Sequence, residues 1–480
     1  MSTTTKAILV IAAVTLVGGI LRFVHLGQPD RKYFDEVYYA SDGCLYAGVD
    51  YRECDLDEDE ERSWVHPPLG KALISFGIDP PGPARGFGNT AVGWRVAAAA
   101  AGTATVGAVA LLAFLLFGRV IWAAVAGLLL ATESLHFVQS RISMLDVFLA
   151  FFVVLGFLFL VGDRRRGERR EAGLPELGPT DPEEVPPPTR LVLGGVRPLR
   201  LLAGASFGAA VAVKWSGVFA LAGAAGLSVA WSIAAAVRRR RDPAIDRREA
   251  GRAFVAEAAG QVLAFILIPA AVYLVAWLPW LAERGFDLTA WLGHHGDMWD
   301  YHRDLDTVKE NGEPIHPYMS RAWSWFLLAR PVAYYWQGDP ECCSEVLGIG
   351  HPFLFWGALL VIPYLLITWI TRREWRAGAV LVPILAQYLP WLLVTRPLFL
   401  FYMTPITPFL ALGTTFLLRD LSRVRLPGRR TAAAVVAVVV VVSVGVFAFF
   451  WPVLAGDRIP YEFWQRRMWV SDEGGLFNWV

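Results

Sequence analysis

Two adjacent carboxylates, Asp35 and Glu36, stand just beyond the first apolar run, within the segment 31–39. A base that takes a proton from a hydroxyl needs a carboxylate whose pKa is tuned to that task. Aromatic neighbours would raise this pKa, whereas Arg31 or Lys32 would lower it. The same pair also suits the N-terminal cap of a short surface helix, and the dipeptide alone favours that cap.

Further charged or titratable residues gather at the ends of other apolar runs. They are His66 and Lys71 in the string HPPLGK, Arg141 and Asp146 in SRISMLD, Lys214 followed by Trp215, and Arg396. Charges at a membrane boundary are costly, and they are usually functional or paired. Arginine binds phosphate oxygens through two parallel hydrogen bonds, so Arg141 is a candidate phosphate ligand.

The roles of the companion residues stay open between binding and structure. Lys214 and Arg396 offer further phosphate contacts, while snorkelling to the interface is the structural alternative for Lys214. Asp146 is placed to orient Arg141 or to pair with another cation. His66 and Lys71 are candidates for contact with a phosphate or a sugar.

A metal site is suggested by His294 and His295, followed by Asp297 and His302. Their spacing matches no standard ligand set, so we assign no metal ligands, and a divalent ion stays an open alternative. The sequence also contains no phosphate-binding loop, dinucleotide fingerprint or zinc spacing. We therefore expect no certain cofactor and no nucleic-acid partner.

The composition places these residues in a membrane protein. Of the 480 residues, 55% are hydrophobic, and the mean hydropathy is +0.44. The apolar residues fall into runs of about 18 or more, the length that a helix needs to cross a bilayer. We predict an all-α polytopic fold with eleven spans, at about 7–26, 91–117, 120–137, 142–161, 199–213, 216–237, 254–280, 351–371, 376–395, 398–418 and 432–451.

The placement of Arg and Lys predicts the orientation of these spans. With a cytoplasmic N-terminus, every dense basic cluster lies inside, including 164–170, 238–241 and 419–430. This is the distribution that the positive-inside rule requires. We therefore expect a multi-pass plasma-membrane protein with an extracytoplasmic C-terminus. The first apolar run is interpreted as a retained helix, because no small-residue cleavage pattern follows it.

The chain is predicted to form a single membrane-embedded domain over residues 1–480. Its two large extracytoplasmic loops are 27–90, which carries the acidic pair, and 281–350. The segment 163–198, rich in Pro, Glu and Arg, is expected to be a cytoplasmic linker. The four cysteines, Cys44 with Cys54 and Cys342 with Cys343, lie in the extracytoplasmic loops, where disulfides are possible.

Several strings, in this order, resemble the protein O-mannosyltransferase family, and the resemblance covers nearly the whole chain. They are Phe34-Asp35-Glu36-Val37, His66-Pro67-Pro68-Leu69-Gly70-Lys71, Ser140-Arg141 with Leu145-Asp146, Val213-Lys214-Trp215-Ser216-Gly217, His316-Pro317-Tyr318 with Trp323-Ser324-Trp325, and Leu389-Pro390-Trp391. The resemblance implies the large membrane glycosyltransferase (GT-C) fold, with its site on the outer face. It also implies a polyprenyl-phosphate-mannose donor and a protein acceptor.

The resemblance assigns roles to individual residues. Asp35 would be the catalytic carboxylate, and Glu36 would support it or the acceptor. Arg141, with Lys214 as a second contact, would hold the donor phosphate in an inverting displacement onto a Ser or Thr hydroxyl. Two departures are present. The loop 281–350 is too short for the β-trefoil of eukaryotic members, which indicates the bacterial form, and the string FYMTP at 401–405 lacks the histidine of the family motif. We therefore expect Tyr402, like Trp215, to support or bind substrate.

Two other functions remain open at the level of sequence. The first is a transferase of the same fold that adds a sugar to a lipid or a cell-wall glycan, because a fold alone does not set the acceptor. The second is a lipid transporter, which would place polar residues along a path through the midplane. The charged residues gather at the outer surface instead, which favours the transferase.

Overall fold

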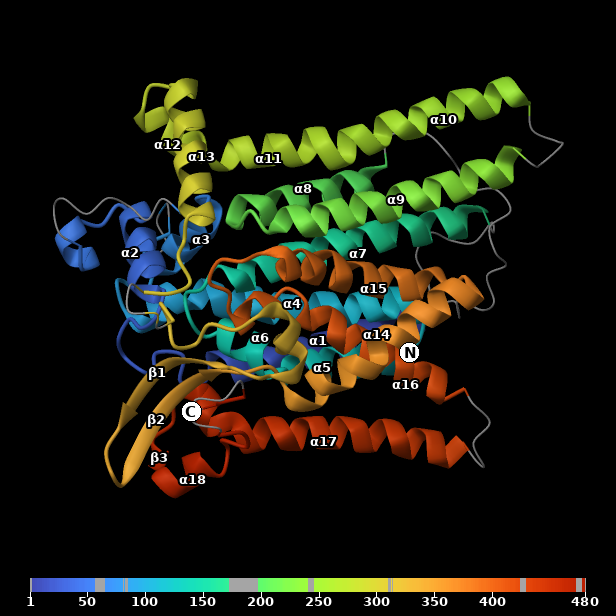
Figure 1. The fold of residues 1–480 in the computed structure, drawn as a ribbon. Coiled ribbons are helices and arrows are strands. Elements are labelled where there is room, and N and C mark those ends of the chain that lie inside the picture. The colour runs from blue at the N-terminus through green and yellow to red at the C-terminus, as the bar shows by residue number, and fades with distance from the viewer. Residues whose placement is uncertain are drawn as a thin grey trace.

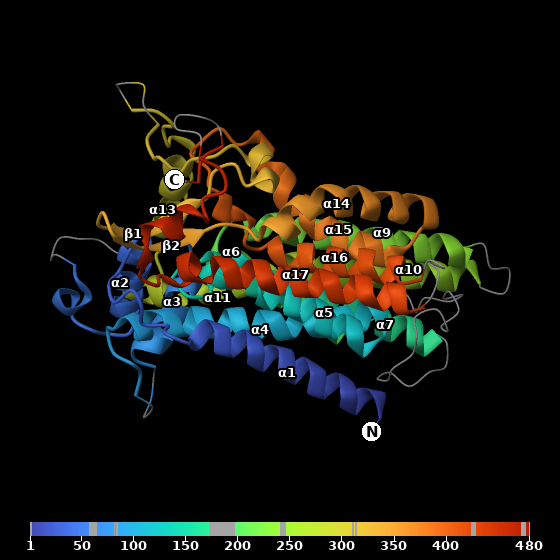
Figure 2. The ribbon, with the colours of Figure 1, turned by 90° about the horizontal axis from the view of Figure 1, so that it is seen from below.

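The computed structural model describes residues 2–56, 65–80, 82, 85–171, 197–240, 246–309, 312, 314–423, 429–471 and 477–479. Most of these residues form long helices that run side by side along one axis, as Figures 1 and 2 show from two directions. The N-terminus and the C-terminus lie toward opposite ends of this bundle. The predicted polytopic helical architecture is confirmed.

Eight helical segments of the described residues are long and apolar enough to cross a membrane. They are Thr3–Phe23 (α1), Ala91–Phe117 (α4), Asp146–Arg170 (in α7, Asp146–Glu171), Gly217–Arg238 (in α9, Gly217–Arg240), Arg248–Ala276 (in α10, Arg247–Val262, η2, Leu263–Leu267, and α11, Ile268–Ala276), Pro352–Arg372 (α14), Trp375–Leu393 (α15, Trp375–Tyr388, with η4, Leu389–Leu393) and Ala433–Ala455 (in α17, Arg429–Ala455).

The other three predicted spans correspond to shorter helices that pack among the long ones. They are α5 (Val120–Ala131), α8 (Pro198–Val213) and α16 (Thr407–Leu421). The span predicted at 120–137 is interrupted, because α5 ends at Ala131 and Glu133 caps a separate helix, α6 (Ser134–Gln139). Its carboxylate accepts the backbone N–H groups of Leu135 and His136.

The connecting elements gather at one end of the bundle, which we call the loop end. It comprises α2 (Glu36–Tyr46), η1 (Tyr51–Cys54), α3 (Leu69–Ile78), α12 (Leu278–Glu283), α13 (Leu288–Arg303), η3 (Ala322–Leu327), η5 (Leu400–Met403), α18 (Tyr461–Gln465) and three strands. The strands are β1 (Val332–Gly338), β2 (Cys342–Gly348) and β3 (Ile459–Pro460), antiparallel and in that order. This small sheet is an addition to the all-α fold that the sequence predicted.

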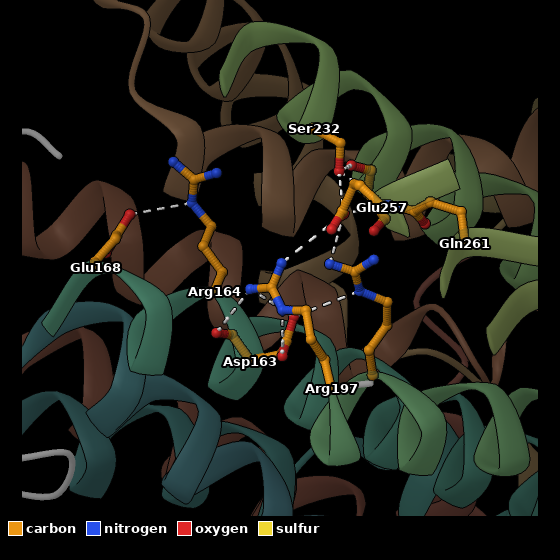
Figure 3. Close-up of polar contacts among 9 residues, drawn as sticks. Asp163, Arg164, Glu168, Arg197, Ser232, Glu257 and Gln261 are labelled. Atoms are coloured by element: carbon orange, nitrogen blue, oxygen red, sulfur yellow. Dashed lines mark hydrogen bonds and ion pairs between the residues drawn. The ribbon is translucent and has the colours of Figure 1, made fainter. Parts of the chain in front are cut away.

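The opposite end carries an ion-pair network that joins α7, α8, α9 and α10 (Figure 3). Arg197 pairs with Asp163 at 3.0 Å, and Arg200 pairs with Glu257 at 2.7 Å. Glu257 also accepts the hydroxyl of Ser232 at 2.7 Å. The segment predicted as a linker, 163–198, therefore starts as the ordered end of α7. Residues 172–196 lie outside the part of the chain that the structure describes.

A buried ion pair fixes α2 against the membrane helices. Glu36 and Arg95 of α4 are both fully buried, and Arg95 Nε and Nη2 each donate to a carboxylate oxygen of Glu36 at 2.8 Å. Glu36 also accepts the backbone N–H of Ser143 at 2.9 Å. Arg95 donates further to the carbonyls of Leu26, Pro29 and Arg31. One carboxylate thus ties together the ends of α1, α4 and α7.

Replacement of Glu36 by alanine is expected to lower the free energy of unfolding by about 3–5 kcal/mol, because it leaves the Arg95 charge buried without its partner. The melting temperature of the purified protein, followed by tryptophan fluorescence, measures the loss. The matched control is Glu53→Ala, which removes an exposed carboxylate from η1. Equal melting temperatures for both variants would contradict a structural role for Glu36.

A disulfide between Cys44 and Cys54 closes α2 onto η1. Both cysteines are fully buried, whereas Cys342 and Cys343 are free. The bridge spans a sequence separation of 10 residues. Closing such a loop removes conformations from the unfolded chain and so stabilises the fold.

We expect the double variant Cys44→Ser/Cys54→Ser to lose about 2–3 kcal/mol of unfolding free energy. Cys342→Ser is the control, because it removes a free cysteine from the same end of the molecule. Thermal melts under non-reducing conditions compare the two. A double variant as stable as the control would show that the bridge contributes nothing.

Candidate active site

Asp35 occupies the N-cap position of α2, but its side chain makes no capping hydrogen bond. The preceding residue, Phe34, holds a left-handed backbone conformation with φ of 52°, which is unfavourable for a bulky residue. The Phe34 ring packs edge-on against Tyr334 and Phe401, with centroids 4.9 and 5.8 Å away. These contacts hold the strained turn that immediately precedes Asp35.

The Asp35 carboxylate is partly exposed, and no hydrogen bond or ion pair joins it to another described residue. Burial raises the pKa of Asp35 to about 6. The charge of Lys214 opposes this rise, and the charge of Asp146 adds to it. An unpaired carboxylate with such a pKa is ionised at neutral pH and can still accept a proton. It therefore has the properties of a general base.

Lys214 and Asp146 form a buried ion pair beside Asp35. Lys214 Nζ lies 3.0 Å from both carboxylate oxygens of Asp146. The two residues come from the end of α8 and the start of α7, respectively. The ammonium also lies 4.7 Å from the centre of the Tyr402 ring, within the range of a cation–π contact. Of the partners predicted for Asp146, the structure selects Lys214.

Arg396 approaches the same group from the segment that follows η4. Its Nη1 donates to the Tyr402 hydroxyl at 3.3 Å, and its guanidinium lies 5.8 Å from the centre of the Trp391 ring. The side chain is partly exposed, and no described carboxylate lies within ion-pairing distance of it. Arg396 thus has donors available for an anion.

Imidazole and indole rings form one wall of the site. His66 stacks on His302 of α13 with ring centres 5.2 Å apart, and Trp215 lies 6.4 Å from His302. His302 Nε2 donates to the carbonyl of Val65 at 2.9 Å. Burial, helped by Lys214 and His302, holds the pKa of His66 well below its usual range, and burial lowers the pKa of His302 to about 4. Both imidazoles are therefore neutral at physiological pH.

The structure gives Arg141 and Lys71 other partners. Arg141 donates to the carbonyls of Arg22, Val24 and His25 at the end of α1. Lys71 pairs with Asp42 of α2 at 3.0 Å, and both side chains are buried. The sequence suggested a phosphate contact for Arg141 and a phosphate or sugar contact for Lys71, whereas in the structure backbone carbonyls and a carboxylate, respectively, accept from these cations. Glu36, engaged with Arg95, is likewise a positioning residue.

The sequence analysis did not predict that Arg95, Tyr39 and His302 would lie in or next to the candidate site at the loop end. Arg95 had a usable signal, since a charge inside an apolar span is costly and marks a partner or a function. Tyr39 is buried in α2, and burial together with Asp35 and Asp146 raises its pKa well above the usual range. His302 appeared in the sequence only as a candidate metal ligand.

Two of the three histidines of α13, His295 and His302, make hydrogen bonds. His295 Nε2 lies 2.7 Å from the Tyr273 hydroxyl, and its Nδ1 lies 2.7 Å from the carbonyl of Trp291. Tyr273 also accepts the indole N–H of Trp215 at 3.0 Å. Within the described ranges, no three His, Cys, Asp or Glu side chains are grouped so that they could hold a metal ion.

Two family models match the chain. Residues 12–173 match the model described as dolichyl-phosphate-mannose-protein mannosyltransferase. Residues 288–473 match the C-terminal four-transmembrane region of protein-O-mannosyltransferase. The first match contains Asp35 and Asp146, and the second contains Arg396 and Tyr402.

Whole-chain comparisons agree with these matches. The polyprenol-phosphate-mannose–protein mannosyltransferase of Mycolicibacterium smegmatis is 31% identical, over 96% of this chain and 91% of the relative. The fold resembles the S. cerevisiae Pmt1-Pmt2 protein O-mannosyltransferase complex bound to the sugar donor, with a TM-score of 0.73, 14% identity, and coverage of 99% of this chain and 94% of that one. It also resembles ArnT from Cupriavidus metallidurans bound to undecaprenyl phosphate, with a TM-score of 0.55, 14% identity, and coverage of 97% and 79%.

The structural likenesses establish the GT-C fold of membrane glycosyltransferases, as the sequence predicted. The sequence relationship extends over nearly the full length of both proteins. The chain therefore belongs to the dolichyl-phosphate-mannose-protein mannosyltransferase family of glycosyltransferases.

Proposed function

We propose that this protein transfers mannose from polyprenyl-phosphate-mannose to Ser or Thr hydroxyls of proteins at the outer face of the plasma membrane. The mannosyl donor and the protein acceptor are those in the names of its curated relatives. The observation that carries the mechanism is the unpaired carboxylate of Asp35, which lies beside cations at the loop end.

Asp35 is the general base of this reaction. The acceptor hydroxyl oxygen attacks the anomeric carbon of mannose, and its proton passes to the Asp35 carboxylate. The bond between that carbon and the phosphate oxygen breaks, and its electron pair leaves with the polyprenyl phosphate. Attack from the side opposite the leaving group inverts the configuration of the sugar.

Arg396 is the cation that meets the charge of the departing phosphate. Its guanidinium is partly exposed and carries donors for phosphate oxygens. Lys214 contributes its positive charge to the site, while Asp146 holds the ammonium in place. Tyr402 lies between the two cations and orients both, through its hydroxyl and its ring. Such fixed charges stabilise a developing anion without reorganisation during the reaction.

The loop end faces the extracytoplasmic side in this proposal, with the N-terminus in the cytoplasm and the C-terminus outside. The basic clusters of α7 and α9 lie at the opposite end, as the positive-inside rule requires. The disulfide of the loop end supports the same orientation, because disulfides persist in oxidising compartments.

Asp35→Asn is expected to reduce mannose transfer about a hundred- to ten-thousand-fold, because the amide cannot take the hydroxyl proton. Transfer of labelled mannose from polyprenyl-phosphate-mannose to a Ser/Thr-rich peptide, catalysed by the purified full-length protein, provides the measurement. Asp30→Asn is the matched control, since it neutralises an exposed carboxylate in the same loop.

Transfer by Asp35→Asn at a near wild-type rate would remove Asp35 from the mechanism. Labelling of a lipid by the wild-type protein, with no labelling of any peptide, would instead contradict a protein acceptor. Melting temperatures of the variants separate loss of the base from loss of the fold.

The rate of transfer should rise with pH through about 6 and then level off. Below that value the protonated fraction of Asp35 increases, so the active base falls about tenfold for each pH unit. Transfer rates at saturating donor and acceptor from pH 4.5 to 8, with the melting temperature measured at each pH, test this expectation. A rate that stays constant across this range in a stably folded protein would contradict the assignment of the base.

A further inference from the structure

A cavity of about 840 Å³ lies at the loop end, between the α2–α3 pair and the α12–α13 pair. Its volume is in the range of about 300–1,000 Å³ that is usual for small-ligand sites. The proposed donor contacts, Arg396 and Lys214, are not part of its wall. The cavity is therefore a space beside the reacting groups that the donor assignment leaves unused.

Two residues connect this cavity to the catalytic group. His66 lines the cavity and also forms part of the imidazole wall near Lys214. Tyr301 of α13 lines it as well, and lies close enough to Asp35 for the carboxylate charge to add to the rise in its pKa, after burial and Tyr38. A molecule held in the cavity thus lies against His66, whose ring stacks on His302 and lies 6.1 Å from the ring of Tyr39 in α2, the helix that Asp35 precedes.

The α13 wall of the cavity is a stripe of carboxylates. Asp297, Asp300 and Asp304 follow one another at spacings of three and four residues, which places them on one face of the helix. Asp300 and Asp304 each pair with Arg303 at 2.8 Å in an exposed setting, where ion pairs are weak and exchangeable. Asp297 makes no hydrogen bond or ion pair within the described part of the chain.

The cations of the wall do not cancel this negative charge. Lys71 is paired with the buried Asp42, so its charge is already balanced. Arg284 lies over Trp280, with its guanidinium 4.1 Å from the ring centre. Glu283 of α12 also lines the cavity, and its carboxylate lies 3.8 Å from Arg284, so these two charges offset each other and the excess comes from the carboxylates of α13. The cavity therefore presents an excess of acidic groups to whatever enters it.

The aromatic residues of the wall are not arranged as a platform for a sugar ring. One side of Trp280 is covered by Arg284, and the ring of His294 lies 5.1 Å from Trp280. Trp277 is 2% exposed and packs against the rings of Trp280 and His294. The carboxylates of the wall, by contrast, suit the cationic side chains of a polypeptide.

We propose that the cavity holds the acceptor polypeptide beside its target hydroxyl and favours segments that carry Lys or Arg near the Ser or Thr. This inference rests on the proposed function and adds a preference for cationic acceptors. The carboxylate stripe attracts a cationic flank and repels an acidic one, so the preference appears mainly in the specificity constant of the acceptor.

Three peptides with the same central Thr test the preference, one flanked by Lys, one by Gln and one by Glu. With purified full-length protein in nanodiscs and polyprenyl-phosphate-mannose as donor, we expect kcat/KM for the Lys peptide to exceed that for the Glu peptide about tenfold at low salt. The Gln peptide should lie between them. The ratio should shrink as salt screens the exposed carboxylates.

Variants of the stripe link the preference to the cavity. Asp297→Lys, at an exposed position, is expected to reverse the ratio of the Lys and Glu peptides, and Asp297→Asn is expected to reduce it. Asp306→Asn is the matched control and should keep the wild-type ratio, because Asp306 is exposed just beyond α13 and outside the cavity wall.

The outcomes separate this inference from the function on which it rests. Equal specificity constants for the three peptides, or a preference for Glu, would overturn the inference and leave protein mannosylation intact. A wild-type preference that both Asp297 variants retain would also overturn the assignment to the cavity. Transfer of mannose to none of the three peptides would overturn the proposed function, and this inference with it.

Discussion

The ion pair between Glu36 and Arg95 is the contact on which the geometry of the loop end depends. Both charges are fully buried, so each needs the other and the surrounding backbone groups to offset its lost hydration. Arg95 uses its remaining donors on the carbonyls that follow α1. Glu36 is therefore held in one position, and Asp35, one residue earlier, is held with it. The adjacent carboxylates therefore differ in role: Glu36 is hydrogen-bonded within the protein, whereas Asp35 remains available to substrate.

The open carboxylate is kept reactive by charges of both signs. Lys214 stabilises the ionised form of Asp35, while burial and Asp146 oppose it. Because Asp146 also binds Lys214, the lysine cannot form a full ion pair with Asp35. A direct pair would lower the pKa of Asp35 and weaken it as a base. The second acid thus protects the basicity of the first, and Arg396 is the cation of the group that has no carboxylate partner among the described residues.

Hydropathy predicted the membrane helices well, because a long apolar run has few alternatives in a bilayer. The predicted spans also placed Asp35, Lys214 and Arg396 on the same side of the membrane. Hydropathy could not predict which partner each charged residue would have. Asp146 binds Lys214 rather than Arg141, because the packing of helices distant in the sequence decides which cation reaches it. The hairpin of β1 and β2 was not predicted, because it lies in a loop of mixed polar and aromatic residues, where no clear periodicity marks a short strand.

Arg141 illustrates how a helix end can imitate a substrate site. The last carbonyls of α1 have no partners within their own helix, and the guanidinium fork reaches several of them at once. A lysine has a single nitrogen and cannot span the same set. An Arg141→Lys enzyme would therefore have a loosened first helix rather than a vacant phosphate pocket. Loss of activity in such an enzyme would therefore report on how the scaffold anchors the loop that carries the base.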